Sequence, residues 1–294
     1  TNDLFNQGRK SFFQGYVISE LCDHPSNWRC EKTLEQFLDE QDVPVLTGVD
    51  TRAITRKLRN YGVLQGVIVP AEMPQEEVEK LLATPEVHDQ VATVTTPEIY
   101  TLGNGKYHVA VMDFGIKQNI LEYLASFDCH LTVFPAYTTA EEILAARPDG
   151  IFLANGPGDP KDLQPIIEEV KKLIGKKPIF GICLGHQILA LANGADTFKM
   201  KFGHRGVNHP VKDLETGRVY ISSQNHGYVV DAEGLEEKNI AHPAFVNVND
   251  GTNEGMAYNG KNIFTVQFHP EACPGPQDSS YLFDRFMKMM GGEK

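Results

Sequence analysis

The sequence is poor in the features that mark secreted, membrane-spanning and nucleic-acid-binding proteins. Its five cysteines are scattered along 294 residues, a pattern that favours reduced thiols over a disulfide framework. No apolar run approaches the ~20 residues needed to cross a bilayer, and the first ten residues do not form a signal peptide. Lys and Arg number 27 against 39 Asp and Glu, so the net charge of −12 opposes binding to nucleic-acid phosphates. We therefore expect a cytoplasmic protein with neither a nucleic-acid nor a membrane partner.

Motifs for metal and phosphate binding are also scarce. Cys22, His24 and Cys30 lie close together, but no second pair of ligands follows at the spacing of a zinc finger. The chain also lacks the Gly-Lys-Ser/Thr segment with which P-loop proteins bind nucleotide phosphates. We therefore expect no metal site and no cofactor on this chain.

The remaining composition is that of a globular protein long enough for two domains, with 41% apolar and 22% charged residues. Residues 91–105, "VATVTTPEIYTLGNG", are rich in Thr, Pro and Gly, which is typical of a linker. We therefore expect a smaller α+β domain over residues 1–90, a linker over 91–105 and an α/β domain over 106–294.

In the second domain, apolar strand-like segments alternate with helical patterns. This order predicts parallel βαβ units, and the nearly continuous apolar strands predict a sheet covered on both faces. Shorter β-rich segments and a last helix follow. Strands are expected within 106–114, 130–136, 150–160, 177–183, 218–230, 244–250, 255–260 and 262–271, and helices near 117–127, 139–146, 163–175 and 279–290.

The first domain shows a different pattern, without regular alternation of strands and helices. Strands are expected within 12–19 and 62–69, and helices within 33–41, 51–62 and 73–83. Asp50 or Thr51 is expected to cap the second of these helices.

Cys183 lies between two glycines in "GICLG", where an apolar strand gives way to a helical pattern. A free cysteine is often a small buried residue, and that interpretation stays open on this segment alone. The pattern is also typical of a nucleophile elbow, in which a strained turn presents the reactive atom. The backbone N–H of Leu184 and the turn Gly156-Pro157-Gly158 would then supply donors for an oxyanion.

His269 and Glu271 lie two residues apart in "FHPEACPGP", so their side chains share a face of an extended segment. A carboxylate beside an imidazole fixes its tautomer, which leaves the other ring nitrogen for a nucleophile. A surface His-Pro-Glu turn is the alternative on these residues alone. Together with Cys183, however, the pair completes the set of nucleophile, base and orienting group that covalent catalysis requires.

The segments "NGPGDP", "GICLGHQ", "SQNHGY" and "QFHPEACPGP", in this order, resemble the class I (triad) glutamine amidotransferase family. More specifically, "KMKFGHRGVNHPV" and "LTGVDTRAITRKLR" resemble the small, glutamine-hydrolysing subunits of carbamoyl-phosphate synthetase. The resemblance extends over nearly the whole chain. It implies an amidotransferase domain with a mostly parallel sheet flanked by helices, in which Cys183 is the nucleophile, His269 the base and Glu271 its partner.

The resemblance also implies which residues contact glutamine: Gly156, Gly158, Leu184, Gln187, Asn225, Gly227 and Tyr228. From the residues alone, a hydrogen bond within the helix for Gln187 and a turn for Asn225 stay open. Tyr228 departs from the phenylalanine that is more usual in the family, and a backbone contact would tolerate the change.

By the same resemblance, ammonia passes to a large synthetase subunit that uses ATP and a divalent metal to make carbamoyl phosphate for arginine and pyrimidine biosynthesis. Two alternatives stay open. One is the glutaminase subunit of another synthetase, such as those that make anthranilate or GMP. The other is a catalytically silent assembly subunit in which Cys183 is a relic.

The small subunits of this family begin with a β-rich segment upstream of the point that matches Thr1. We therefore expect a first domain that is partial, with unpaired strand edges near residues 12–19. The resemblance also implies that a serine contact to glutamine is missing.

Overall fold

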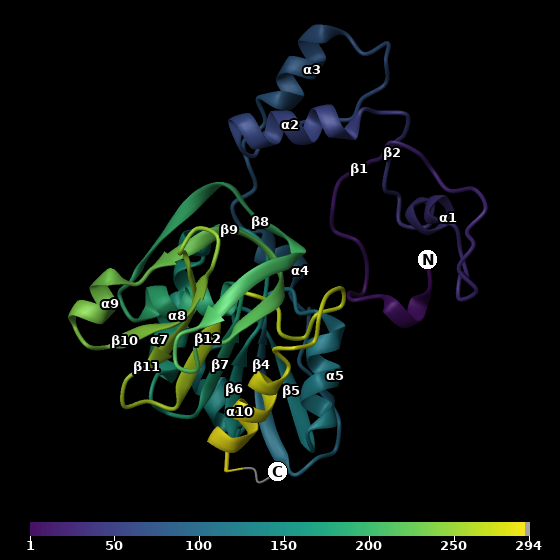
Figure 1. Cartoon of the computed structure of the whole chain (residues 1–294). Helices are drawn as coiled ribbons and strands as arrows, with labels where there is room; N and C mark the ends of the chain where they lie inside the picture. Colours follow the sequence, from purple (N-terminus) through teal and green to yellow (C-terminus); the bar gives the residue numbers. More distant parts are fainter. Residues whose placement is uncertain (292–294) are drawn as a thin grey trace. The chain divides into compact units, whose positions relative to one another are not determined.

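Two units, Thr1–Val87 and His88–Lys294, divide the chain in the computed structural model, which describes residues 1–291. The first unit has one pair of short parallel strands and three α-helices (Figure 1). Asp50, rather than Thr51, caps the second helix, because its carboxylate accepts from the N–H of Ala53 at 2.9 Å. The elements are η1 (Asp3–Phe5), β1 (Tyr16–Val17), α1 (Leu34–Asp39), β2 (Val45–Leu46), α2 (Thr51–Tyr61) and α3 (Gln75–Leu82).

The three helices predicted for this unit are confirmed, but the strand expected over 62–69 is not. Its apolar residues Leu64, Val67 and Ile68 are exposed. The strand expected over 12–19 is reduced to Tyr16–Val17, which pairs with β2. The physical reason is that apolar alternation makes a strand only where a second strand accepts its hydrogen bonds, and neither segment has such a partner along its full length among the described residues.

The second unit is organised around a ten-stranded sheet in the order β3-β5-β4-β6-β7-β12-β11-β10-β8-β9 (Figure 1). The central strands from β5 to β12 are parallel, whereas the strands on both sides pair antiparallel. The bounds are β3 (Tyr100–Leu102), β4 (Tyr107–Asp113), β5 (Cys129–Pro135), β6 (Gly150–Leu153), β7 (Ile179–Ile182), β8 (Asp196–Asp213), β9 (Val219–Asp231), β10 (Ala241–Asn247), β11 (Asn253–Tyr258) and β12 (Ile263–Val266).

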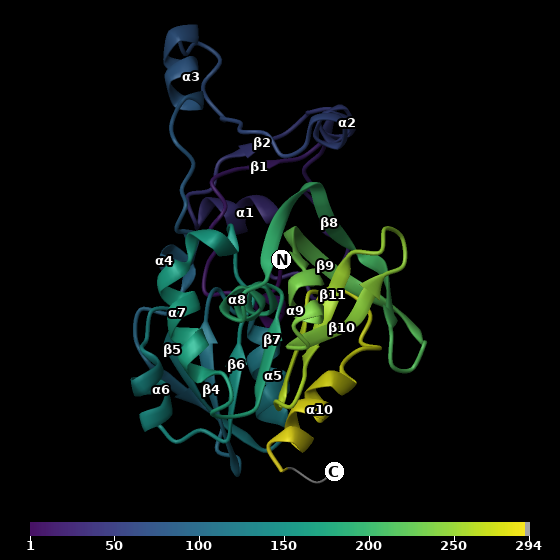
Figure 2. The same ribbon diagram turned by 90° about the vertical axis from the view of Figure 1, so that its left-hand side faces the viewer.

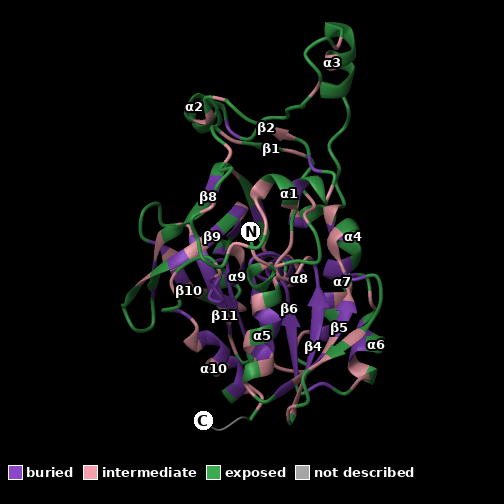
Figure 3. Ribbon diagram, turned by 90° about the vertical axis from the view of Figure 1, so that its right-hand side faces the viewer, coloured by how far each residue is buried: buried purple, intermediate pink, exposed green. Residues whose placement is uncertain are grey.

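Helices cover both faces of the parallel strands, as Figure 2 shows from the side. Side chains of α6, α7 and α8 pack on one face, and those of α5 and α10 pack on the other. Figure 3 shows that the strands between them are buried. The helices are α4 (Gln90–Val94), α5 (Gln118–Ser126), α6 (Ala140–Ala145), η2 (Pro160–Asp162), α7 (Gln164–Leu173), α8 (Leu184–Ala192), α9 (Glu233–Glu237) and α10 (Tyr281–Met289).

The predicted α/β fold class is therefore confirmed. Within residues 1–291, no helix combines the length and the apolar character that a bilayer span requires.

The segment 91–105, expected as a linker, contains structure of the second unit. It includes most of α4 and the edge strand β3. Val91 is fully buried in the core, and the N–H of Thr96 donates to the Asp113 carboxylate at 2.8 Å. Composition suggested a linker because Thr, Pro and Gly are common in loops, but Thr and Val also suit a short strand at the edge of a sheet.

The long antiparallel pair β8 and β9 was only partly expected. The predicted strand at 218–230 matches β9, but no strand was predicted for β8, which spans Asp196–Asp213. Phe198, Met200 and Phe202 alternate with lysines at its start, but the residues that follow are mainly His, Arg, Gly and Asn. Many residues of β8 are exposed, so the strand is held by its hydrogen bonds to β9 and not by an apolar face.

Gly185, in the first turn of α8, fixes how closely this helix approaches the sheet. Its N–H donates to the carbonyl of Ala154 at 3.0 Å. A methyl group added at Gly185 would lie 2.3 Å from the carbonyl oxygen of Leu153, closer than any ordinary contact. The helix therefore packs on β6 through a residue without a side chain.

We predict that Gly185→Ala destabilises the second unit by about 1–3 kcal/mol, because overpacking against backbone outweighs the better helix propensity of alanine. The measurement is urea unfolding followed by far-ultraviolet circular dichroism.

The matched control is Gly234→Ala in α9, where an added methyl group meets no atom within 4 Å. This change is expected to be neutral or to stabilise by about 0.5–1 kcal/mol. Equal unfolding midpoints for the two variants would contradict the close approach at Gly185.

Candidate functional site

Cys183 occupies the corner between β7 and α8, with φ of 54° and ψ of −104°. A positive φ is uncommon for a residue with a side chain and costs roughly 1–3 kcal/mol, so such a conformation persists only where its surroundings impose it. Gly181 and Gly185 on either side allow the turn, because a methyl group on Gly181 would lie 3.0 Å from the backbone of Gly185. The turn has the strained strand-to-helix form of a nucleophile elbow.

His269 and Glu271 lie beside this corner, just beyond β12. The Nδ1 atom of His269 is 2.7 Å from Oε1 of Glu271, and Glu271 has no exposed surface. The N–H of His269 donates to the carbonyl of Ser223 in β9 at 2.9 Å, which fixes the backbone. Because Nδ1 faces the carboxylate, Nε2 is the ring atom left for the thiol of Cys183.

The electrostatic environment favours a charged imidazole. Burial by itself lowers the pKa of His269, but the Glu271 carboxylate and the contact with Cys183 outweigh it and raise the pKa to about 10. Burial likewise opposes ionisation of Glu271, yet His269 and Lys117 hold the pKa of this carboxyl below its usual value. The pair is therefore an ion pair that also orients the imidazole.

Lys117 is a member of the site that sequence reasoning missed. Its Nζ atom is 3.0 Å from Oε1 of Glu271 and also donates to the carbonyl of Ala272. Asn119 donates from its side chain to the Glu271 carbonyl at 2.5 Å. A signal was present in the sequence, since both residues follow the buried strand β4, and polar residues at the carboxyl ends of parallel strands lie at the usual site of ligand binding.

Asp113, the last residue of β4, shapes the turn that carries Lys117. Its Oδ1 atom accepts from the N–H groups of Gly115 and Ile116, both at 2.8 Å. The side chain of Asn155 accepts from the N–H of Lys117 at 3.3 Å and donates to the carbonyl of Gly115 at 3.1 Å. The lysine therefore extends from a turn that is hydrogen-bonded on two sides.

Gly156 and Gly158 lie in the loop after β6, and each position requires glycine. A methyl group on Gly156 would be 2.2 Å from the carbonyl oxygen of Phe114. Gly158 has φ of 98°, in the left-handed region. The loop therefore packs closely against the Phe114–Lys117 turn, and Gly158 is exposed.

Leu184 and Gln187 belong to α8. As the first residue of the helix, Leu184 has a backbone N–H without an intrahelical acceptor. Gln187 is almost fully buried, and its Nε2 atom donates to the carbonyl of Tyr228 at 3.0 Å and to Oε1 of Gln267 at 2.8 Å. Its amide nitrogen thus joins α8 to β9.

Asn225, Gly227 and Tyr228 lie within four consecutive residues of β9. Asn225 is exposed, and its carbonyl is 4.0 Å from Sγ of Cys183. Gly227 and Tyr228 are partly buried. The segment therefore passes directly over the elbow, with its backbone closest to the thiol.

Comparison with known proteins shows the family to which the chain belongs. Residues 110–289 match the family model "Glutamine amidotransferase class-I". Residues 1–68 match "Carbamoyl-phosphate synthase small chain, CPSase domain".

Two curated relatives share about half of their residues with this chain. The carbamoyl phosphate synthase small chain of Clostridium perfringens is 52% identical over 94% of this chain and 78% of its own length. That of Clostridium acetobutylicum is 48% identical over 98% of this chain and 82% of its own length.

Among solved structures, a Thermoplasma acidophilum protein provisionally described as part of a GMP synthase matches with a TM-score of 0.55 and 21% identity. The match covers 64% of this chain and 96% of that protein. This similarity concerns the fold alone.

The raised pKa of His269 predicts how stability depends on pH. A histidine whose pKa is raised on folding stabilises the folded protein. The stabilisation is complete below the pKa of the unfolded chain, about 6.5, and is lost as the pH rises through the pKa of the folded protein. A Cys183→Ala variant removes the thiol together with its share in raising this pKa, and leaves Glu271 as the group that favours the charged imidazole. The free energy of unfolding should therefore fall above pH 7 with a slope that approaches about −1.4 kcal/mol per pH unit from this group.

Urea unfolding between pH 7 and 9 measures the slope, and the control is the double variant Cys183→Ala/His269→Gln. The double variant is expected to lack this contribution. Identical slopes in the two proteins would mean that His269 is not held in its charged form.

Proposed function

Because the chain belongs to the class I glutamine amidotransferases, as a carbamoyl-phosphate synthase small chain, it is the glutamine-hydrolysing component of that synthase, and we propose that Cys183, His269 and Glu271 carry out the hydrolysis. The observation that carries this assignment is the contact series from Cys183 through His269 to the buried Glu271 at a strained turn. A purely structural cysteine needs neither the strain nor the ion pair.

The reaction follows from these positions. The Cys183 thiolate attacks the side-chain amide carbon of glutamine, and the C–N bond breaks as His269 gives its proton to the departing ammonia. A glutamyl thioester remains on Cys183. Neutral His269 then takes a proton from water, the resulting hydroxide attacks the thioester carbon, and glutamate leaves with recovery of the thiolate. Glu271 stays ionised and orients the imidazole throughout.

Two features support stabilisation of the oxyanion in this reaction. The N–H of Leu184 at the start of α8 follows the nucleophile directly, which is the usual place of one donor in an elbow. A backbone N–H of the partly exposed Gly156–Gly158 loop is proposed as the second donor. Removal of one such donor typically costs about 10²–10³ in rate.

Glutamine itself is proposed to bind along the Asn225–Tyr228 segment of β9. The closeness of the Asn225 carbonyl to Sγ supports this placement. Gln187 contributes indirectly, because its amide nitrogen holds the Tyr228 carbonyl. We therefore regard Gln187 as a positioning residue for β9.

A large-subunit partner is implied by the small-chain family. We propose that this subunit receives the ammonia and holds the ATP and divalent metal for carbamoyl phosphate synthesis. The absence of a P-loop motif from the sequence of this chain is consistent with such a division of labour.

The alternatives are less well supported. A glutaminase subunit of another synthetase does not require the first domain, yet residues 1–68 match the carbamoyl-phosphate synthase small-chain domain. A catalytically silent subunit has no need of a cysteine held at positive φ against a buried histidine and glutamate.

We predict that Cys183→Ser lowers glutamine-dependent synthesis by the complex by roughly three or more orders of magnitude, because the nucleophile is lost. Synthesis from free ammonia should remain, since the partner's chemistry does not use the thiol. Carbamoyl phosphate formation with each nitrogen source is the measurement.

Cys22→Ser, at an exposed cysteine of the first unit, is the matched control and should keep both activities. An equal loss with glutamine and with ammonia in Cys183→Ser would argue against the nucleophile assignment.

We also predict that glutamine hydrolysis by this chain is slow alone and rises when the large subunit binds, because uncoupled hydrolysis would waste glutamine. Glutamate release is measured with and without the partner. Equal rates of glutamine hydrolysis with and without the large subunit would show that the two subunits are not coupled in this way.

A further inference from the structure

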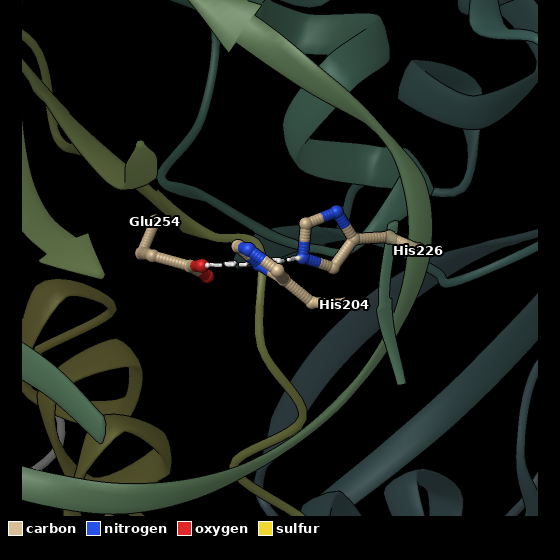
Figure 4. A group of neighbouring side chains, drawn as sticks. All are labelled: His204, His226 and Glu254. Carbon is tan, nitrogen blue, oxygen red and sulfur yellow. Dashed lines mark hydrogen bonds and ion pairs between the residues drawn. The ribbon is translucent and has the colours of Figure 1, made fainter. Parts of the chain in front are cut away.

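A second group of titratable side chains lies on the antiparallel side of the sheet. His204 on β8, His226 on β9 and Glu254 on β11 are all buried and point toward one another (Figure 4). None of the three belongs to the catalytic set. The removal of a carboxyl group and two imidazoles from solvent costs free energy, so their burial together calls for a compensating interaction.

The spacing of their atoms is that of metal ligands. Nδ1 of His204 is 3.2 Å from Nε2 of His226 and 3.1 Å from Oε1 of Glu254, and Nε2 of His226 is 4.0 Å from the same oxygen. A tetrahedral zinc ion with bonds of about 2.0–2.1 Å separates its ligand atoms by about 3.3–3.4 Å. The observed triangle therefore needs only small adjustments to hold an ion.

In His204 and in His226, one ring nitrogen bonds a group outside the cluster, so the other nitrogen presents its lone pair to the cluster. Nδ1 of His226 lies 2.9 Å from the carbonyl of Tyr228, which only accepts, so the proton of a neutral ring is on Nδ1 and Nε2 carries a lone pair. Nε2 of His204 lies 2.8 Å from the Asp250 carboxylate, which places the proton of a neutral ring there. Nδ1 then carries a lone pair, which the Asn247 amide approaches at 3.4 Å. Metal-binding histidines characteristically have such second partners.

Two ring lone pairs and a carboxylate thus converge, and they repel one another unless a cation lies between them. The second oxygen of Glu254, Oε2, is buried and has no hydrogen-bond partner among the described residues. Asn247 donates to Oε1 at 3.1 Å, so only one oxygen of this carboxylate is satisfied by neighbouring protein groups. The remaining oxygen is a free ligand atom.

Gln224 supplies a fourth ligand atom, its amide oxygen. Its Oε1 atom is 3.3 Å from Nε2 of His226, and its Nε2 atom donates to the hydroxyl of Ser222 at 3.2 Å. The amide oxygen therefore lies beside His226, and the same side chain also hydrogen-bonds Glu254. Two imidazoles, a carboxylate and an amide oxygen form a donor set that suits zinc better than magnesium or calcium, which prefer oxygen ligands alone.

We propose that His204, His226 and Glu254 bind a structural zinc ion, with the amide oxygen of Gln224 as the fourth ligand. The ion would fasten β8, β9 and β11 together. His226 lies between Asn225 and Gly227, so the metal would also hold in place the β9 segment that passes over Cys183.

The competing explanation is a proton in place of the metal. A doubly protonated His204 donates to Asp250 and to Glu254 and so satisfies the same geometry without an ion. Metal content distinguishes the two, because a proton-bridged cluster retains no zinc. Asp250, which bonds His204, is partly exposed and lines a surface pocket with Thr252 and Asn253.

The experiment uses a Cys183→Ser parent, since a reactive thiol beside His269 is itself a zinc ligand. The parent is loaded with zinc, dialysed extensively and analysed by mass spectrometry for metal content. We expect close to one zinc ion per chain, a rise in the unfolding midpoint on zinc addition, and visible absorption of tetrahedral cobalt when Co²⁺ replaces zinc.

Glu254→Gln in this parent keeps the shape of the side chain but removes the charge, and should lower the zinc content by about tenfold or more. His242→Gln, at an exposed histidine bonded to Asn259, is the matched control and should retain the metal. Circular dichroism establishes that each variant is folded.

A folded parent that retains no zinc and whose midpoint is unchanged by zinc or a chelator would overturn the proposal in favour of the proton-bridged cluster. Equal zinc content in Glu254→Gln and the parent would overturn it as well. Neither result bears on glutamine hydrolysis, which is measured separately through Cys183.

Discussion

The carboxylate of Glu271, which has no exposed surface, joins segments that are distant in the chain. It binds His269, which follows β12, and Lys117, which follows β4. An unpaired charge at this depth would cost several kcal/mol, so both partners are needed for the carboxylate to stay ionised. The charge that orients the imidazole thereby also joins the segment after β4 to the segment after β12.

The geometry of the parallel strands explains why the elbow lies beside this ion pair. β4, β7 and β12 run in the same direction, so the turns after them meet at one edge of the sheet. The antiparallel strands close the site from the other side, where β9 touches both His269 and the thiol. Hydrogen bonds within the second histidine cluster join β8 to β9 and to β11.

Much of this arrangement was predictable from local sequence. Alternating strands and helices indicated the α/β class, and the glycines around Cys183 indicated the turn, because short-range sterics govern both. Predictions failed where stability comes from distant partners. The segment 62–69 found no strand to pair with, residues 91–105 entered the second unit, and β8 formed through its pairing with β9 although many of its residues are exposed.

The sequence by itself determined the chemical types and their local geometry: a cysteine forced into an elbow by flanking glycines, and a histidine and a glutamate on one face of a short segment. Only the tertiary structure decided which charges surround them. Lys117 is 154 positions before Glu271, and His204 is 50 positions before Glu254, so no periodicity links the members of either pair. Burial then sets their energetics, because the interaction of two charges depends on the distance and dielectric that folding alone creates.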